Sequence, residues 1–179
     1  MAHNLFFALW PDDEVRERIA SAARQLRNAH APNGRWIRPQ RYHLTLRFLG
    51  EHSTLPDPLI AACRSAGDAV RSAPFSFALD VAASFPNRRI PWWLGCHAMP
   101  DALDALWTAL AESLAENGIA HDEPTPRAAH VTILRDADKR LAPEPIDPIT
   151  WSADGFVLVD SAFGAESSYR ILHRWPLGP

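Results

Sequence analysis

Two segments of the chain repeat the same polar pair inside an apolar run. YHLTLRFL contains His43 and Thr45. AHVTILRD contains His130 and Thr132. An unperturbed imidazole has a pKa of about 6.5, so at neutral pH one ring can accept a proton while another donates one. With a hydroxyl beside each ring to stabilise an oxyanion, facing pairs suit general acid–base chemistry at a phosphate.

The first segment is predicted to be a strand with one polar and one apolar face. Successive strand side chains point to opposite faces, so His43, Thr45 and Arg47 are expected to share the polar face. Phe48 is expected to join the core leucines behind them. Arg47 is therefore the arginine that we favour as a phosphate ligand, because a guanidinium binds phosphate through paired hydrogen bonds.

The second segment is predicted to be a similar strand, with His130 and Thr132 on one face. Strict alternation puts Arg135 on the opposite face, so it reaches a ligand only if a bulge turns it inward. A single histidine in a strand is more often structural than catalytic. The recurrence of the pair in two apolar segments, about half the chain apart, favours a functional reading.

Alternating strands and helices are expected to position these residues. Residues 141–149 contain Pro143, Pro145 and Pro148, which exclude regular helix and central strand there. Residues 31–41 are expected to form a loop. The patterns predict strands at 4–10, 43–49, 75–85, 90–98, 129–135, 155–163 and 168–175, and helices at about 12–28, 58–72 and 101–117. This order predicts an α+β fold with mainly antiparallel sheets.

Composition places limits on function. The 179 residues suffice for one domain, and no apolar run approaches the roughly 20 residues that span a bilayer. The N-terminal segment lacks the features of a signal peptide, and Cys63 and Cys96 match no metal or redox spacing. We therefore expect a cytoplasmic protein without membrane association. The net charge of −3 implies that any contact with nucleic acid is local.

Five segments together resemble the RNA 2′,3′-cyclic phosphodiesterases, also called 2′-5′ RNA ligases, of the two-histidine phosphoesterase superfamily. They are FFALWPDDEVRERI, HLTLRFLGE, FPNRRIPWWLG, HVTILR and RWPL, in that order over nearly the whole chain. The resemblance implies a single domain over residues 1–179, with two pseudo-symmetric lobes around an active-site cleft. Ala129 departs from the family, in which proline is common before the second histidine.

The resemblance also implies an activity. It is metal-free hydrolysis of a 2′,3′-cyclic phosphate at an RNA end to a 2′-phosphate, with no cofactor. By motif, His43 becomes the proton donor to the leaving oxygen and His130 the proton acceptor that activates water. Expected partners are RNA ends or small cyclic-phosphate nucleotides, with no obligate protein partner. A reverse reaction that joins RNA ends through a 2′-5′ bond stays open.

Other side chains near the motifs are candidate ligands. Thr45 and Thr132 are expected to bind the phosphate together with Arg47 and Arg135. Further cations lie near the two motifs or on the turn between them: Arg35, Arg38, Arg41, Arg88, Arg89, Arg127, Lys139 and Arg140. Four aromatic residues are candidates for stacking a base, although such residues more often belong to a core: Trp36, Tyr42, Trp92 and Trp93. Because Trp92 and Trp93 are adjacent, one is expected to face the core and the other the outside.

Three alternatives remain. The first is an enzyme of the same superfamily acting on another small cyclic phosphate, such as a nucleotide or ADP-ribose derivative. The second is a module that binds RNA ends without turnover, which would not need two titratable rings. The third is a zinc hydrolase, but the sequence has no HExxH motif, no clustered cysteines and no carboxylate beside either histidine.

Overall fold

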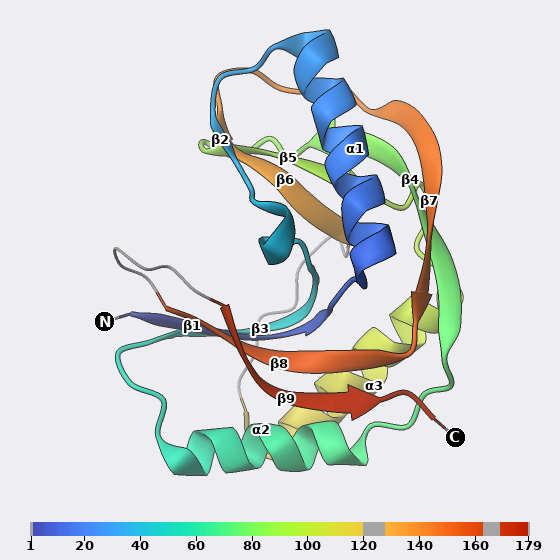
Figure 1. Cartoon of the computed structure of the whole chain (residues 1–179). Coiled ribbons are helices and arrows are strands. Elements are labelled where there is room, and N and C mark those ends of the chain that lie inside the picture. The colour runs from blue at the N-terminus through green and yellow to red at the C-terminus, as the bar shows by residue number, and fades with distance from the viewer. Residues whose placement is uncertain (1, 120–127, 163–168, 179) are drawn as a thin grey trace.

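Two antiparallel sheets with helices on their outer sides make up the fold (Figure 1). The structure is a computed structural model and describes residues 2–119, 128–162 and 169–178. One sheet has the strand order β3-β1-β8-β9, with β1 (His3–Leu9), β3 (Leu44–His52), β8 (Gly155–Ala162) and β9 (Tyr169–Pro176). The other has the order β2-β6-β5-β4-β7, with β2 (Arg35–Trp36), β4 (Phe75–Ser84), β5 (Ile90–Gly95), β6 (His130–Ala137) and β7 (Glu144–Ala153). The α+β prediction is confirmed.

The helices link the two sheets. They are α1 (Asp13–His30), α2 (Asp57–Ala69) and α3 (Asp101–Glu116), with a short 3-10 helix η1 (Pro39–Arg41). α1 follows β1 of the four-stranded sheet but packs against β7 of the five-stranded sheet, while α2 and α3 pack beside β9 and β3 (Figure 1). Buried side chains from both sheets and all three helices form one hydrophobic cluster, so the two sheets share a core. None of the helices in the described part of the chain is both long and apolar enough to cross a membrane.

Two elements differ from the sequence-based expectation. β2 lies inside the predicted loop, because its two residues pair with β6. β7 includes Pro145 and Pro148, where no strand was expected. β7 lies at the edge of its sheet, where a proline needs no hydrogen bond on the open side. The proline argument therefore excluded a central strand correctly but overlooked an edge strand.

Trp175 near the end of β9 holds α2 against the four-stranded sheet. Its ring stacks on Phe156 with centroids 5.0 Å apart, and its Nε1 donates a hydrogen bond to Asp68 Oδ1 at 2.7 Å. Gly67 of α2 leaves room for this ring, since a Cβ at position 67 would lie 2.4 Å from two of its carbons. The glycine is thus needed for close packing rather than for backbone conformation.

Replacement of this glycine tests the contact. We expect Gly67→Ala to lower the free energy of unfolding by about 1 kcal/mol, because overpacking costs about 1–3 kcal/mol and the better helix propensity of alanine offsets part of it. Urea unfolding measures the change. Gly178→Ala is the matched control, because a Cβ there meets nothing within 4 Å. Unchanged or increased stability of Gly67→Ala would contradict the packing account.

Candidate active site

The imidazoles of His43 and His130 are held in the same way. Nδ1 of His43 lies 2.7 Å from the Arg41 carbonyl oxygen, and Nδ1 of His130 lies 2.7 Å from the Ala128 carbonyl oxygen. A carbonyl oxygen only accepts hydrogen bonds, so each Nδ1 carries the proton and donates it. Each neutral ring therefore has its Nε2 lone pair free to act as a base, in an orientation set by the main chain.

A one-residue shift in strand pairing changes the face of Arg47. Thr45 pairs with Ala8, but Arg47 pairs with Phe7, which leaves Leu46 as an extra residue in β3. Beyond this bulge the alternation is reversed. Arg47 points into the core, is 1% exposed and donates a hydrogen bond to the Trp107 carbonyl oxygen at 2.8 Å. The prediction that Arg47 shares the face of Thr45 is wrong.

The same shift moves Phe48 in the opposite direction. It pairs with Phe6 and is 37% exposed, whereas the sequence predicted a core position. The apolar character of Phe48 could not reveal this, because the face of a side chain after a bulge depends on the pairing with β1. An exposed phenyl ring therefore follows the first histidine motif on its own side of the sheet.

An equivalent shift in β6 brings Arg135 to the face of the second histidine. Thr132 pairs with Trp93 and Leu134 pairs with Trp92, so that Ile133 is the extra residue. Leu134 is buried in the core and Arg135 is exposed. The bulge that the sequence analysis required for an inward Arg135 is thus present. The charge of Arg135 acts on His43 and lowers the pKa of that ring.

The two motif strands come together across the two sheets. β3 of the four-stranded sheet lies beside β6 of the five-stranded sheet. The charge of a protonated His130 also lowers the pKa of His43, so the two rings are within electrostatic range of each other. The structure therefore brings His43, His130 and Arg135 of the predicted site within electrostatic range of one another and removes Arg47 from the site. Thr45 and Thr132 lie on the same strands as the two histidines, two residues further along.

Aromatic side chains that the sequence analysis did not select surround His43. Phe6 stacks on its ring with centroids 4.9 Å apart, and Trp10 lies nearly parallel at 6.0 Å. Tyr169 meets the ring edge-on at 5.3 Å, and the Arg41 guanidinium lies over Tyr169 at 4.4 Å. The alternation of β1 was an available signal, because it places Phe6 and Trp10 on the face opposite the core leucines.

His130 has its own aromatic neighbours. Phe85 meets its ring edge-on at 4.9 Å, and the Trp93 ring lies 6.1 Å away. Trp92 is fully buried and Trp93 is partly exposed, which confirms the expected split of this pair. The other two aromatic candidates, Trp36 and Tyr42, pack with the core on the α1 side and do not face the histidines. Of the further cations, Arg127 lies outside the described residues.

Burial lowers the pKa of both histidines. For His43 burial is the largest cause and brings the pKa to about 4, with smaller contributions from the charges of Arg135, His130 and Arg41. Burial also lowers the pKa of His130. The hydrogen bonds to the carbonyls of Arg41 and Ala128 oppose both shifts. Both rings are therefore neutral at neutral pH when no ligand is bound.

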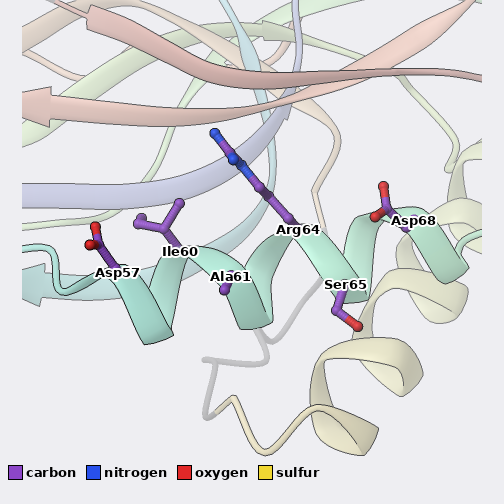
Figure 2. A pocket seen from close by; sticks show the side chains of 6 residues that line it. All are labelled: Asp57, Ile60, Ala61, Arg64, Ser65 and Asp68. Carbon is purple, nitrogen blue, oxygen red and sulfur yellow. The ribbon is translucent and has the colours of Figure 1, made fainter.

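The surface also has a depression of about 560 Å³ on α2. Figure 2 shows the side chains that line it. Its lining includes Asp57, Ile60 and Asp68, and Arg64 extends from the helix to donate a hydrogen bond to the Leu172 carbonyl oxygen at 3.4 Å. Neither motif contributes to it. Its size alone therefore does not make it a catalytic site.

Within the described ranges no group of three or more His, Cys, Asp or Glu side chains is arranged to hold a metal ion.

Comparisons with known proteins agree with this arrangement. A family model described as LigT-like phosphoesterase matches residues 9–93. The RNA 2′,3′-cyclic phosphodiesterase of Escherichia coli is 31% identical over 177 residues, which cover 97% of this chain and 96% of that protein. The RNA 2′,3′-cyclic phosphodiesterase of Thermus thermophilus is 30% identical over 190 residues, with 97% and 89% covered.

Solved structures show the same likeness. The crystal structure of E. coli LigT complexed with 3′-AMP matches with a TM-score of 0.81 and 31% identity over 100% of both chains. The TT0787 protein of T. thermophilus matches with a TM-score of 0.77 and 26% identity over 97% of both chains. Fold and paired motifs are those of a two-histidine phosphoesterase. Within that class the chain belongs to the LigT-like phosphoesterase family.

The protonation of His43 can be measured directly. Because its folded pKa of about 4 lies below the ordinary 6.5, we expect the ring to stay neutral with Nδ1 protonated when the pH falls from 7 to 5.5. The ¹⁵N shifts of the imidazole report both the charge and the tautomer, and a His43→Asn variant assigns the resonance. A protonation midpoint at or above 6.5 in the ligand-free protein would contradict the burial argument.

Proposed function

We propose that this enzyme opens 2′,3′-cyclic phosphates at RNA ends and leaves a 2′-phosphate. The observation that carries the proposal is the matched pair of rings, each with Nδ1 bonded to a carbonyl and Nε2 free. The relatives of similar length are RNA 2′,3′-cyclic phosphodiesterases, and E. coli LigT has been crystallised in complexes with 3′-AMP, ATP and NADP+. All three ligands are nucleotides that carry phosphate, and in our proposal such a phosphate lies between the two rings.

The proposed reaction is an in-line displacement at phosphorus. Nε2 of His130 accepts a proton from a water molecule, whose oxygen forms a new bond to phosphorus. The bond from phosphorus to O3′ breaks, and His43 gives its Nε2 proton to that oxygen, which leaves a 3′-hydroxyl and a 2′-phosphate. The donor and acceptor roles follow the family resemblance. With the 5′-hydroxyl of a second RNA end in place of water, the same transfers form a 2′-5′ bond.

The low pKa of His43 fits the donor role once substrate is bound. An anionic phosphate beside the ring favours the protonated form and offsets the cost of burial. The proton is then held by a ring that releases it readily, because its surroundings disfavour the charge. In this scheme the Thr45 and Thr132 hydroxyls donate hydrogen bonds to the non-bridging oxygens, and the Arg135 guanidinium balances their charge.

Product analysis tests this proposal. A short RNA with a 2′,3′-cyclic phosphate end, incubated with chelator, is expected to yield a 2′-phosphate, separable from a 3′-phosphate by chromatography. His43→Ala and His130→Ala should each lower kcat by about 10²–10⁴, because each removes one proton transfer. His52→Ala is the matched control, since His52 has the same spacing to a threonine but lies at the far end of β3, bonded to the Leu49 carbonyl.

The outcomes separate the alternatives. Wild-type protein that binds the cyclic end without opening it would be an RNA-end-binding module. Preference for a cyclic nucleotide or an ADP-ribose derivative over RNA would indicate another small cyclic phosphate as substrate. Loss of activity with chelator would favour a metal-dependent mechanism and contradict the proposal.

Arg135 and Arg47 provide a paired test of the phosphate contact. We expect Arg135→Met to lower kcat/KM by about 10- to 100-fold, because a charge-assisted contact to the phosphate is lost. Arg47→Met is expected to change kcat/KM by less than about threefold per folded molecule, because Arg47 lies in the core. Circular dichroism measures the folded fraction for the correction. A larger loss from Arg47→Met than from Arg135→Met would refute the assignment.

A further inference from the structure

Arg35 and Arg135 are direct cross-strand partners at the edge of the five-stranded sheet. Arg35 of β2 pairs with Arg135 of β6 in an antiparallel register, which places both side chains on the same face. Two like charges in directly opposed positions destabilise a sheet. The pair therefore has a cost in stability that negative charge on this face offsets, whether from a neighbouring carboxylate or from an anionic ligand.

The face in question is the one that carries His130. Trp36, the neighbour of Arg35, packs edge-on against Trp92 in the core on the α1 side. Successive side chains alternate, so Arg35 projects to the opposite face, together with Thr132 and Arg135. Adjacent strands are about 4.8 Å apart, so Arg35 lies one strand away from the strand that carries His130 and Arg135.

A third arginine and one carboxylate complete the cluster. Asp136 lies 3.6 Å from Arg35 and 3.9 Å from Arg89, which lies in the turn between β4 and β5. These side chains are well exposed: Arg35 by 60%, Arg89 by 89% and Asp136 by 44%. Three guanidinium groups with one carboxylate leave the cluster positive, although the whole chain carries a net charge of −3.

Two backbone positions beside the cluster have unusual conformation or packing. Asp136 has a φ of 56°, a conformation that residues other than glycine adopt infrequently and that asparagine and aspartate tolerate best. Gly34 lets β2 approach β6 closely, because a Cβ there would lie 2.9 Å from the Arg135 carbonyl oxygen. The main chain thus brings Arg35 and Asp136 into contact at the edge of the sheet.

We infer that Arg35 and Arg89 bind the phosphate on the 5′ side of the terminal nucleotide, so that the enzyme is selective for an RNA strand over a mononucleotide. The inference depends on the proposed function, which places the cyclic phosphate between the histidines near Arg135. In this arrangement the RNA chain continues from the cyclic phosphate towards β2. Its next phosphate then meets the guanidinium groups of Arg35 and Arg89. Guanidinium groups recognise such phosphates without regard to base sequence.

Two substrates separate this second contact from the first. One is a nucleoside 2′,3′-cyclic phosphate, which has no 5′-side phosphate. The other is a dinucleotide with the same cyclic end, which has one. We expect Arg35→Gln to lower kcat/KM for the dinucleotide by about fivefold to tenfold and to leave the mononucleotide within about twofold. In a plot of log(kcat/KM) against the logarithm of the salt concentration, the slope for Arg35→Gln should also be shallower than that for the wild type by about 0.7, with the dinucleotide as substrate but not with the mononucleotide.

Two further variants sharpen the result. Arg24→Gln is the matched control, because Arg24 is 60% exposed like Arg35 and is paired with Glu17 on α1, on the other side of the sheet. Asp136→Asn keeps a residue that tolerates the same φ and removes the negative charge, so we expect a higher kcat/KM for the dinucleotide at low salt.

The outcomes are distinguishable. If the wild-type enzyme opens both substrates equally well, and Arg35→Gln affects neither or both alike, the inference fails while the proposed function stands. A third substrate is a nucleoside 2′,3′-cyclic phosphate that also carries a 5′-phosphate. If Arg35→Gln lowers kcat/KM for this mononucleotide as much as for the dinucleotide or any longer RNA, the contact recognises a single phosphate and selectivity for an RNA strand is refuted. If the wild type opens neither substrate, the proposed function itself fails.

Discussion

The hydrogen bond from each histidine Nδ1 to a carbonyl two residues earlier is the interaction on which the site depends. It fixes the tautomer, so that Nε2 is the basic atom, and it holds the ring against the strand that carries it. Because the acceptor is main chain and lies close in sequence, each half of the protein builds this arrangement locally. The two sheets then need only to bring together two imidazoles whose tautomer and orientation are already fixed.

The two halves are alike up to the bulge and differ beyond it. In each motif strand one residue is left over after the threonine, so the fifth position after the histidine returns to the face of the motif. That position holds Phe48 in the first half and Arg135 in the second. One half therefore offers an apolar ring and the other a cation. A nucleotide has a matching asymmetry, because it carries an aromatic base at one end and an anionic phosphate at the other.

Burial among aromatic rings connects packing with chemistry. Phe6, Trp10 and Tyr169 contact His43 from β1, the segment after it and β9, and they remove water from one side of its ring. The resulting low pKa keeps the His43 ring uncharged at neutral pH. In the proposed reaction an anion that enters this site supplies the charge that favours protonation of His43, so that substrate binding prepares the ring for proton transfer. The arginines whose charges act on His43 would attract that anion.

The sequence by itself determined the strands other than β2 and β7, the two that carry the His-x-Thr pairs and most of the apolar positions behind those pairs, because these follow from a period of two along a single strand. Tertiary structure alone decided the faces of Arg47, Phe48 and Arg135. A bulge is a mismatch between two paired strands, and neither strand encodes it alone. The same holds for β7, whose prolines are acceptable because it is the edge strand of its sheet, and for the pKa of His43, which depends on rings that lie far away along the chain.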